Sequence, residues 1–192
     1  MKIYFDGASW SGGKEVSPLE AFPHLMAEIL NAEYDNFSLN GGSNQRCARN
    51  ILIKHDVTQY DLVVLQFSHR QRLEFIKPDL GEWRQQTSRK ARKDFWTDWY
   101  KHVYTEEYGI CLEMMWKKSI ENHCALHNVP CLITSSNQDD KVKYDFFLDF
   151  PFGKYEKMGD IVDECGLGHP SPKGHSMIAT DLVALLRQKN ML

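Results

Sequence analysis

The first fifteen residues, MKIYFDGASWSGGKE (1–15), decide how this chain folds. The apolar run at residues 3–5 is typical of a buried strand, and it stops at Gly7. Glycine lets a chain turn sharply where a strand ends, and small polar residues continue the segment as far as Gly13. Ser9 is therefore either an ordinary turn residue or a nucleophile held at the carboxyl edge of a sheet.

Length and composition favour one domain over residues 1–192. The chain is 42% hydrophobic, which is enough to build a sizeable core. No run of about 18 apolar residues occurs and the chain starts directly with a strand, so we expect a cytoplasmic protein without a membrane span or signal peptide. The 5 cysteines show no CxxC spacing, which favours a reducing compartment. A net charge of −3 makes nucleic acid an unlikely partner.

The pattern along the chain predicts alternating helices and strands. A helix starts at Ser17, which is followed by a proline and by Glu20 in the arrangement of a capping box. Residues 60–67 (YDLVVLQF) are nearly all apolar, as in a central parallel strand that is covered on both faces. Apolar residues recur every three to five positions across 95–127, which predicts a long helix with a bend at Gly109.

Further segments complete the expected order. Strands are predicted at 34–39 and at 131–136, and residues 141–150 are either a weaker fifth strand or a loop. A closing helix is predicted from Ser171, its N-cap, to about Lys189. The alternation predicts an α/β sandwich around a parallel sheet of four to five strands, with functional residues at the carboxyl ends of the strands.

Four loops should meet at that edge of the sheet. Three follow strands directly and carry Ser9, the segment NGGSN (40–44) and the segment QFSHRQR (66–72); the fourth, GLGHPSPKGH (166–175), precedes the closing helix. We expect them to bring together one serine, two glycines and two histidines: Ser9, Gly41, Gly42, His69 and His169.

These residue types are suited to nucleophilic catalysis. A serine hydroxyl is a poor nucleophile until a base takes its proton, and histidine suits that role because it titrates near neutral pH. His169 lies just before a helix with a well-defined start, so its position should be fixed. The glycines at 41–42 let the backbone approach a substrate closely enough for an N–H group to hold a developing oxyanion.

Three segments together resemble the SGNH, or GDSL-like, hydrolase superfamily, particularly its short microbial and phage-type members. They are GASWSGG (7–13), GGSN (41–44) and HPSPKGH (169–175), and the last is the most specific. The resemblance implies a three-layer α/β/α flavodoxin-like fold, hydrolysis of esters such as acetyl groups on carbohydrates, and no metal or organic cofactor. It also implies a virion-associated location if a phage encodes the protein.

By position, the resemblance makes Ser9 the nucleophile, with its own N–H in the oxyanion hole. Gly42, or alternatively Gly41, would supply the second N–H group, and His169 would be the general base. The family usually has an asparagine after the third strand, where this chain has Ser68 and His69. Asn44 or His69 are the candidate substitutes for that donor, and the other interpretation of His69 is a surface position.

The family also usually has an aspartate three residues before the histidine, and that position is Gly166 here. Asp163 or Glu164 are the candidate replacements that would orient His169. Loss of such a carboxylate costs about 10⁴ in rate in a well-studied serine protease. The sequence therefore predicts a Ser–His pair and leaves open which carboxylate orients the histidine.

Other polar residues have structural interpretations. We expect His175, one turn into the closing helix, to make a structural hydrogen bond. Ser11 should shape its loop by bonding to nearby backbone. Arg72 and Glu74 resemble a charged pair that holds the loop after the third strand in related sequences.

The segment 84–93 (RQQTSRKARK) contains five basic residues and no acid, and aromatic residues flank it across 83–100. Such a combination can bind nucleic acid or a polyanionic glycan. The favoured interpretation is a solvated insertion over about 76–100, with a lid over the serine cleft as the alternative.

The leading hypothesis is a serine esterase that hydrolyses a small acyl ester, with an O-acetylated sugar as the favoured substrate. The competing hypothesis is a degenerate binding or structural protein that uses the segment 83–100.

Overall fold

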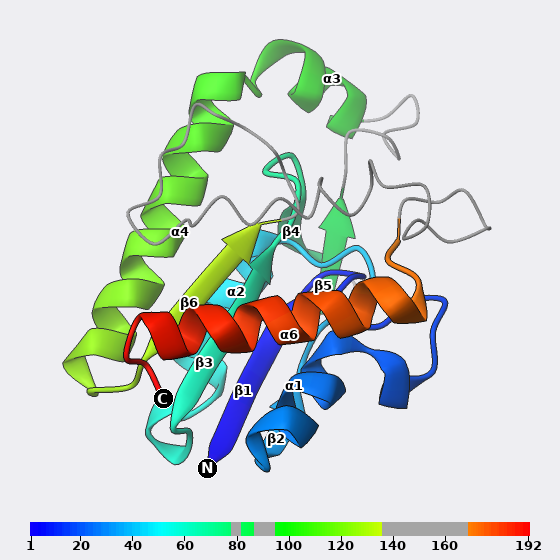
Figure 1. The fold of residues 1–192 in the computed structure, drawn as a ribbon. Helices are drawn as coiled ribbons and strands as arrows, with labels where there is room; N and C mark the ends of the chain where they lie inside the picture. The colour runs from blue at the N-terminus through cyan, green and yellow to red at the C-terminus, as the bar shows by residue number, and fades with distance from the viewer. Residues whose placement is uncertain (78–81, 87–94, 136–168) are drawn as a thin grey trace.

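In a computed structural model, which describes residues 1–77, 82–86, 95–135 and 169–192, four parallel strands form the central sheet (Figure 1). They are β1 (Lys2–Gly7), β2 (Glu33–Asn36), β3 (Leu62–Phe67) and β6 (Cys131–Ser135), in the order β2-β1-β3-β6. All three neighbouring pairs are parallel. The predicted parallel sheet is confirmed, while the weak strand predicted at 141–150 lies outside the described residues.

Helices cover both faces of this sheet. On one face α1 (Phe22–Leu30) packs against α6 (Pro172–Gln188), which Figure 1 shows crossing the strands. On the other face lie α2 (Asn44–Arg49) and α4 (Glu106–Leu126). Side chains alternate along β1, so that Ile3 and Phe5 enter the first core and Tyr4 enters the second. The predicted α/β/α sandwich is therefore confirmed.

The start of the first helix differs from the prediction. The capping box between Ser17 and Glu20 is present, but it caps only a short 3-10 helix, η1 (Pro18–Glu20). The chain then becomes extended at Ala21, and α1 begins afresh at the next residue. Pro23 explains the break, because it has no N–H for a continuous helix and is tolerated only in a first turn.

The long helix predicted over 95–127 is divided at a different place. It forms α3 (Phe95–His102) and α4, and Thr105 caps α4 by accepting a hydrogen bond from the Tyr108 N–H. The interruption lies between His102 and Glu106, whereas Gly109 lies inside α4. A Cβ there would lie 2.0 Å from the Tyr104 hydroxyl oxygen, so this glycine permits close packing.

Two strands of the described chain were not predicted. β4 (Leu73–Lys77) and β5 (Glu82–Gln86) pair antiparallel in a separate two-stranded sheet. α2 also continues into a π-helical turn, η2 (Asn50–Lys54), and a 3-10 turn, η3 (Val57–Gln59), follows. Part of the expected insertion at 76–100 thus has regular structure, and its role as a lid remains a prediction.

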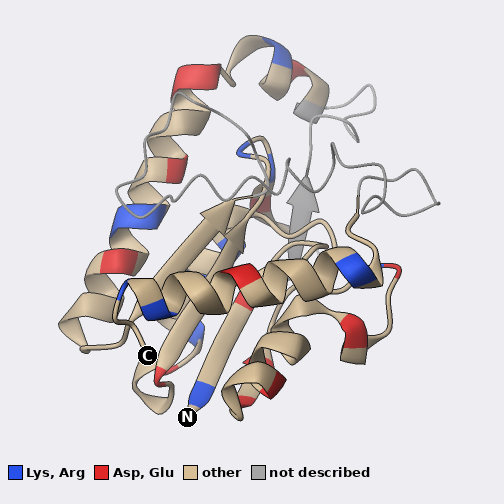
Figure 2. Cartoon of the chain, viewed as in Figure 1, with Lys and Arg blue, Asp and Glu red and all other residues tan. Residues whose placement is uncertain are grey.

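Acidic and basic residues are interspersed over the described elements (Figure 2). Along α4 the acidic residues come first, a pair of lysines follows at 117–118, and Glu121 comes after them. Most of the basic run at 84–93 lies outside the described residues. Among the described helices, none combines the length and the apolar character that crossing a membrane requires.

His175 joins the two helices of one face, as its predicted structural role requires. Its side chain is fully buried, its Nδ1 atom accepts a hydrogen bond from the Phe22 N–H at 3.2 Å, and its ring stacks on the Phe22 ring. This contact links the start of α1 to the first turn of α6.

Lowering the pH should destabilise the fold through His175. Burial is the main cause that lowers the pKa of His175 to about 4, and His169 adds to it. The unfolded chain binds a proton here near the ordinary pKa of about 6.5. The contribution of neutral His175 to the free energy of unfolding is therefore fully present above about pH 6.5. It is lost as the pH falls toward 4, and the loss for this one group is about 3 kcal/mol.

Urea unfolding between pH 7 and pH 4 measures this loss. His175→Asn is the control, because its side-chain oxygen can accept the same backbone N–H without binding a proton. The free energy of unfolding of the variant should depend less on pH than that of the wild type. If it falls equally steeply with pH in both proteins, groups other than His175 cause the loss.

Candidate active site

Ser9 lies in a tight loop directly after β1. Its side chain is almost buried, with 7% of the residue exposed. The loop closes on itself, because the Gly12 N–H donates to Ala8 O at 2.9 Å and the Lys14 N–H donates to Ser9 O at 3.0 Å. The N–H of Ser9 donates no hydrogen bond to any described residue. This loop presents the serine at the carboxyl edge of the sheet, as predicted.

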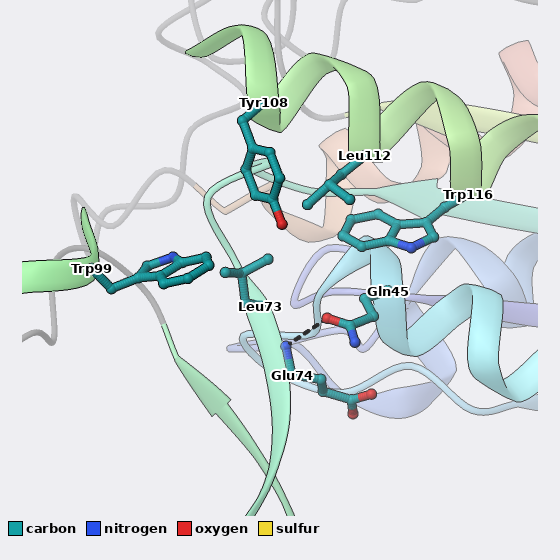
Figure 3. A pocket seen from close by; sticks show the side chains of 7 residues that line it. All are labelled: Gln45, Leu73, Glu74, Trp99, Tyr108, Leu112 and Trp116. Carbon is teal, nitrogen blue, oxygen red and sulfur yellow. Dashed lines mark hydrogen bonds between the residues drawn. The ribbon is translucent and has the colours of Figure 1, made fainter. Parts of the chain in front are cut away.

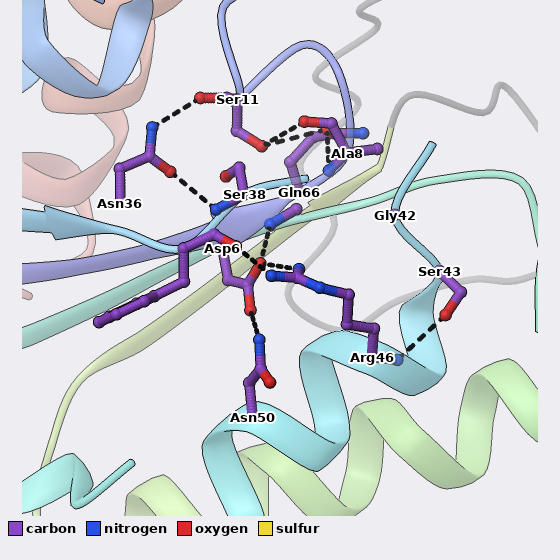
Figure 4. A network of polar contacts seen from close by, with 12 residues as sticks. Asp6, Ala8, Ser11, Asn36, Ser38, Gly42, Ser43, Arg46, Asn50 and Gln66 are labelled. Carbon is purple, nitrogen blue, oxygen red and sulfur yellow. Dashed lines mark hydrogen bonds and ion pairs between the residues drawn. The ribbon is translucent and has the colours of Figure 1, made fainter. Parts of the chain in front are cut away.

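Gln66 in β3 fixes the shape of the same loop (Figure 4). Its side-chain Oε1 accepts a hydrogen bond from the Ala8 N–H at 3.0 Å and lies 3.3 Å from the Ser11 hydroxyl. The Ser11 hydroxyl also lies within donating distance of Ala8 O, at 3.2 Å. The predicted loop-shaping role of Ser11 is confirmed, whereas that of Gln66 was not foreseen.

His169 lies just before α6 and faces the serine. Ser171 caps this helix by accepting a hydrogen bond from the Gly174 N–H at 3.2 Å, which fixes where the helix starts. The Ser9 Oγ and His169 Nε2 atoms are 2.9 Å apart, although 160 positions separate the two residues in the sequence. The structure thus brings together the predicted nucleophile and the predicted base.

The second ring nitrogen of His169 faces a carboxylate that the sequence did not indicate. Its Nδ1 atom lies 3.4 Å from Glu15 Oε2, and it makes no hydrogen bond with the described part of the chain. Glu15 has a left-handed backbone conformation, with φ of 75°. The predicted orienting residues, Asp163 and Glu164, lie outside the described residues.

The glycines of the second loop allow close backbone contact. A Cβ on Gly42 would lie 2.7 Å from Gly7 O and 2.8 Å from Leu39 O, so only glycine fits there. However, the Gly42 N–H donates to Leu39 O at 2.7 Å, so the prediction that it faces an oxyanion is wrong in this conformation. Gly41 adopts a φ of 80°, and its N–H donates no hydrogen bond within the described ranges.

Asn44 and Ser68 bind each other rather than an open cleft. The Ser68 N–H donates to Asn44 Oδ1 at 2.7 Å, and Asn44 Nδ2 donates to Ser68 O at 3.1 Å. The Ser68 hydroxyl donates to Gly42 O at 2.7 Å, and Asn44 Nδ2 also lies 3.3 Å from Glu113 Oε1. Both residues are buried, so the prediction that they face substrate is corrected: they join the second and third loops.

In the third loop, His69 takes one of its two expected positions, whereas Arg72 differs from expectation. The His69 side chain is exposed, which places it on the surface rather than among the buried site residues. Arg72 does not pair with Glu74. Glu74 instead receives two hydrogen bonds from Arg49, each at 3.0 Å, so this ion pair joins α2 to β4.

A buried carboxylate anchors the first loop from below (Figure 4). Asp6 is fully buried at the end of β1, and its two oxygens accept hydrogen bonds from Arg46 at 2.6 Å, the Gly7 N–H at 2.7 Å and Asn50 at 2.8 Å. Arg46 also donates to Phe37 O. Burial raises the pKa of Asp6, while Arg46 acts in the opposite direction.

An aromatic pocket of about 420 Å³ lies between β4 and α4 (Figure 3). Its lining is mostly aromatic and aliphatic, with a side-chain amide and a carboxylate at one side: Gln45, Leu73, Glu74, Trp99, Tyr108, Leu112 and Trp116. Gln45 Oε1 accepts a hydrogen bond from the Glu74 N–H at 3.0 Å. Neither Ser9 nor His169 is among the described residues that line it.

Comparison with known proteins identifies the fold. No model of a known protein family matches the sequence, and no curated protein matches it. The solved structure of TesA is 10% identical with a TM-score of 0.50, and the match covers 100% of each chain. A mutant of the esterase AlinE4 is 11% identical with a TM-score of 0.50, covering 97% of this chain and 95% of the other.

The esterase EstA from Pseudoalteromonas sp., inhibited by monoethylphosphonate, is 13% identical with a TM-score of 0.49, and the match covers 97% of each chain. The likeness to TesA and to the AlinE4 mutant establishes the three-layer α/β fold.

Proposed function

We propose that the protein is a serine ester hydrolase of SGNH type that acts on a small acyl ester, with an O-acetylated carbohydrate as the favoured substrate class. The observation that supports this most directly is the 2.9 Å separation of Ser9 Oγ and His169 Nε2. At this distance the imidazole can take the proton from the hydroxyl as the hydroxyl attacks a carbonyl carbon.

The reaction would follow two balanced steps. In the first, Ser9 Oγ bonds to the ester carbonyl carbon and its proton passes to His169 Nε2. The tetrahedral intermediate then expels the alcohol, which takes that proton, and leaves an acyl-serine. In the second, His169 takes a proton from water, the hydroxide attacks the acyl carbon, and Ser9 Oγ leaves with the proton.

The resemblance names three backbone N–H groups for the oxyanion hole, those of Ser9, Gly41 and Gly42. Those of Ser9 and Gly41 make no hydrogen bond to described residues, whereas that of Gly42 is occupied. Backbone donors aimed at a developing oxyanion are usually a large part of catalysis, and each is worth about 10²–10³ in kcat. We therefore assign the oxyanion hole to Ser9 and Gly41.

The test is the hydrolysis of p-nitrophenyl esters of increasing acyl length, together with acetylated sugars. Mass spectrometry of the protein quenched during turnover, followed by peptide mapping, should place an acyl group on Ser9. Shorter acyl chains should be preferred. If wild-type protein neither hydrolyses any ester above the rate of its Ser9→Ala variant nor carries an adduct, the competing hypothesis of a binding protein with a degenerate site is favoured.

A further inference from the structure

We propose that Glu15 is the carboxylate that positions His169, so that the first loop supplies two of the three groups of the site. This inference rests on the proposed function. Ser9 Oγ lies 2.9 Å from one ring nitrogen of His169, and Glu15 Oε2 lies 3.4 Å from the other. The three side chains therefore form a continuous series from hydroxyl to imidazole to carboxylate.

The surroundings of His169 Nδ1 require an acceptor. This atom is buried and has no hydrogen-bond partner in the described ranges. A buried N–H without an acceptor is costly, by about 1–3 kcal/mol. A carboxylate beside Nδ1 keeps the proton on that atom, and Nε2 is then the unprotonated nitrogen that faces Ser9. Glu15 Oε2 is at a distance that a small side-chain adjustment would turn into a hydrogen bond.

The conformation of Glu15 points in the same direction. Its φ of 75° lies in the left-handed region, which costs a residue with a Cβ about 1 kcal/mol and which glycine adopts freely. The residue is only partly exposed, at 17% for its side chain, and it also lies 3.8 Å from Lys14 Nζ. The strained backbone holds a carboxylate against His169 where a glycine would have made an easier turn.

This arrangement differs from the pattern that the sequence resembles. That pattern places the carboxylate three residues before the histidine, where this chain has Gly166. The alternatives, Asp163 and Glu164, belong to the segment before His169, whereas Glu15 follows the nucleophile by six positions. The two possibilities predict opposite outcomes when the carboxylates are replaced singly.

The decisive experiment compares Glu15→Gln and Glu15→Gly with Asp163→Asn and Glu164→Gln, using p-nitrophenyl acetate. Glu15→Gln should lower kcat by about 10³–10⁴-fold with little change in KM, because a positioning residue acts through His169. Glu15→Gly should lose the same activity while keeping or raising Tm, since glycine relieves the left-handed backbone. Asp163→Asn and Glu164→Gln should stay within about threefold of wild type.

A second readout does not depend on activity. In protein labelled with ¹⁵N-histidine, the Nδ1–H proton of His169 should give a resonance protected from exchange, assigned by its absence in His169→Gln. Glu15→Gln should remove that protection, and the Asp163 and Glu164 variants should keep it. If the wild-type protein is not an esterase but this pattern holds, the pairing stands and the proposed function fails.

The inference is overturned if Glu15→Gln keeps both its kcat and the protected proton. It is equally overturned if the protected proton disappears in Asp163→Asn or Glu164→Gln instead. A loss of activity in Glu15→Gln accompanied by unfolding would be separated from a positioning role by Glu15→Gly, whose backbone is better suited to the loop.

Discussion

Replacing Ser9 with alanine should lower kcat for p-nitrophenyl acetate by about 10⁴–10⁶-fold. The Oγ atom is the only hydroxyl oxygen that the structure places at 2.9 Å from His169 Nε2 within the described residues. Without it no acyl-enzyme can form, and only the oxyanion donors and substrate binding contribute to the remaining rate. His169→Ala should cause a loss of similar size. The double variant should be no worse than either single variant, because the two groups act as one unit.

The matched control is Ser11→Ala, two positions along the same loop. The Ser11 hydroxyl bonds to loop backbone and to Gln66 instead of His169. The variant should lose at most about 1–2 kcal/mol of stability and keep most of its activity. If Ser11→Ala were as inactive as Ser9→Ala at equal folding, the assignment of the nucleophile would fail.

Replacing Arg46 with methionine should lower the free energy of unfolding by about 3–5 kcal/mol at pH 7. Arg46 lies 2.6 Å from the fully buried carboxylate of Asp6, and its loss would leave that charge without its ionic partner. Breaking one side of a buried ion pair is far more damaging than replacing both sides. Urea unfolding followed by circular dichroism measures the effect.

The pH dependence of this variant and a double variant test the cause. Burial raises the pKa of Asp6, so protonation stabilises the folded state as the pH falls through that raised value. The loss of stability caused by Arg46→Met should therefore become smaller as the pH is lowered from 7. Adding Asp6→Asn should recover part of the lost stability at pH 7, because the amide is neutral. If the changes in free energy of unfolding caused by Arg46→Met and Asp6→Asn simply add in the double variant, a charge-based explanation is contradicted.

The parts of the fold that could be predicted from the sequence depend on local chemistry. The apolar run of β3 fits only a strand buried on both faces, and Ser171 followed by proline marks the start of α6 wherever the helix packs. The predictions that failed concern helix boundaries, where one local signal overrides another. Pro23 interrupts a helix that the capping box alone would continue, and Thr105 caps α4 at a site where periodicity gave no break.

The sequence predicted the Ser9 and His169 pair, but it did not indicate the carboxylate beside His169. Ser9 and His169 lie at strand and helix ends that parallel topology brings to one edge. Glu15 was missed because its role depends on a left-handed turn and on a contact between distant loops, and neither has a signature in a single sequence. Asn44 is a polar residue in one of the loops expected at the site, yet its side-chain amide is hydrogen-bonded to the Ser68 backbone.

In the proposed mechanism, the separation of Ser9 and His169 by 160 positions sets when the protein can become active during its synthesis. A ribosome delivers the loop with Ser9 early and His169 only after β6, so the growing chain lacks the proposed base until then. The contact between His175 and the Phe22 N–H is likewise made only when α6 reaches α1. Nascent chains stalled before α6 should therefore be inert toward cellular esters, and the first turnover would report that α6 has docked.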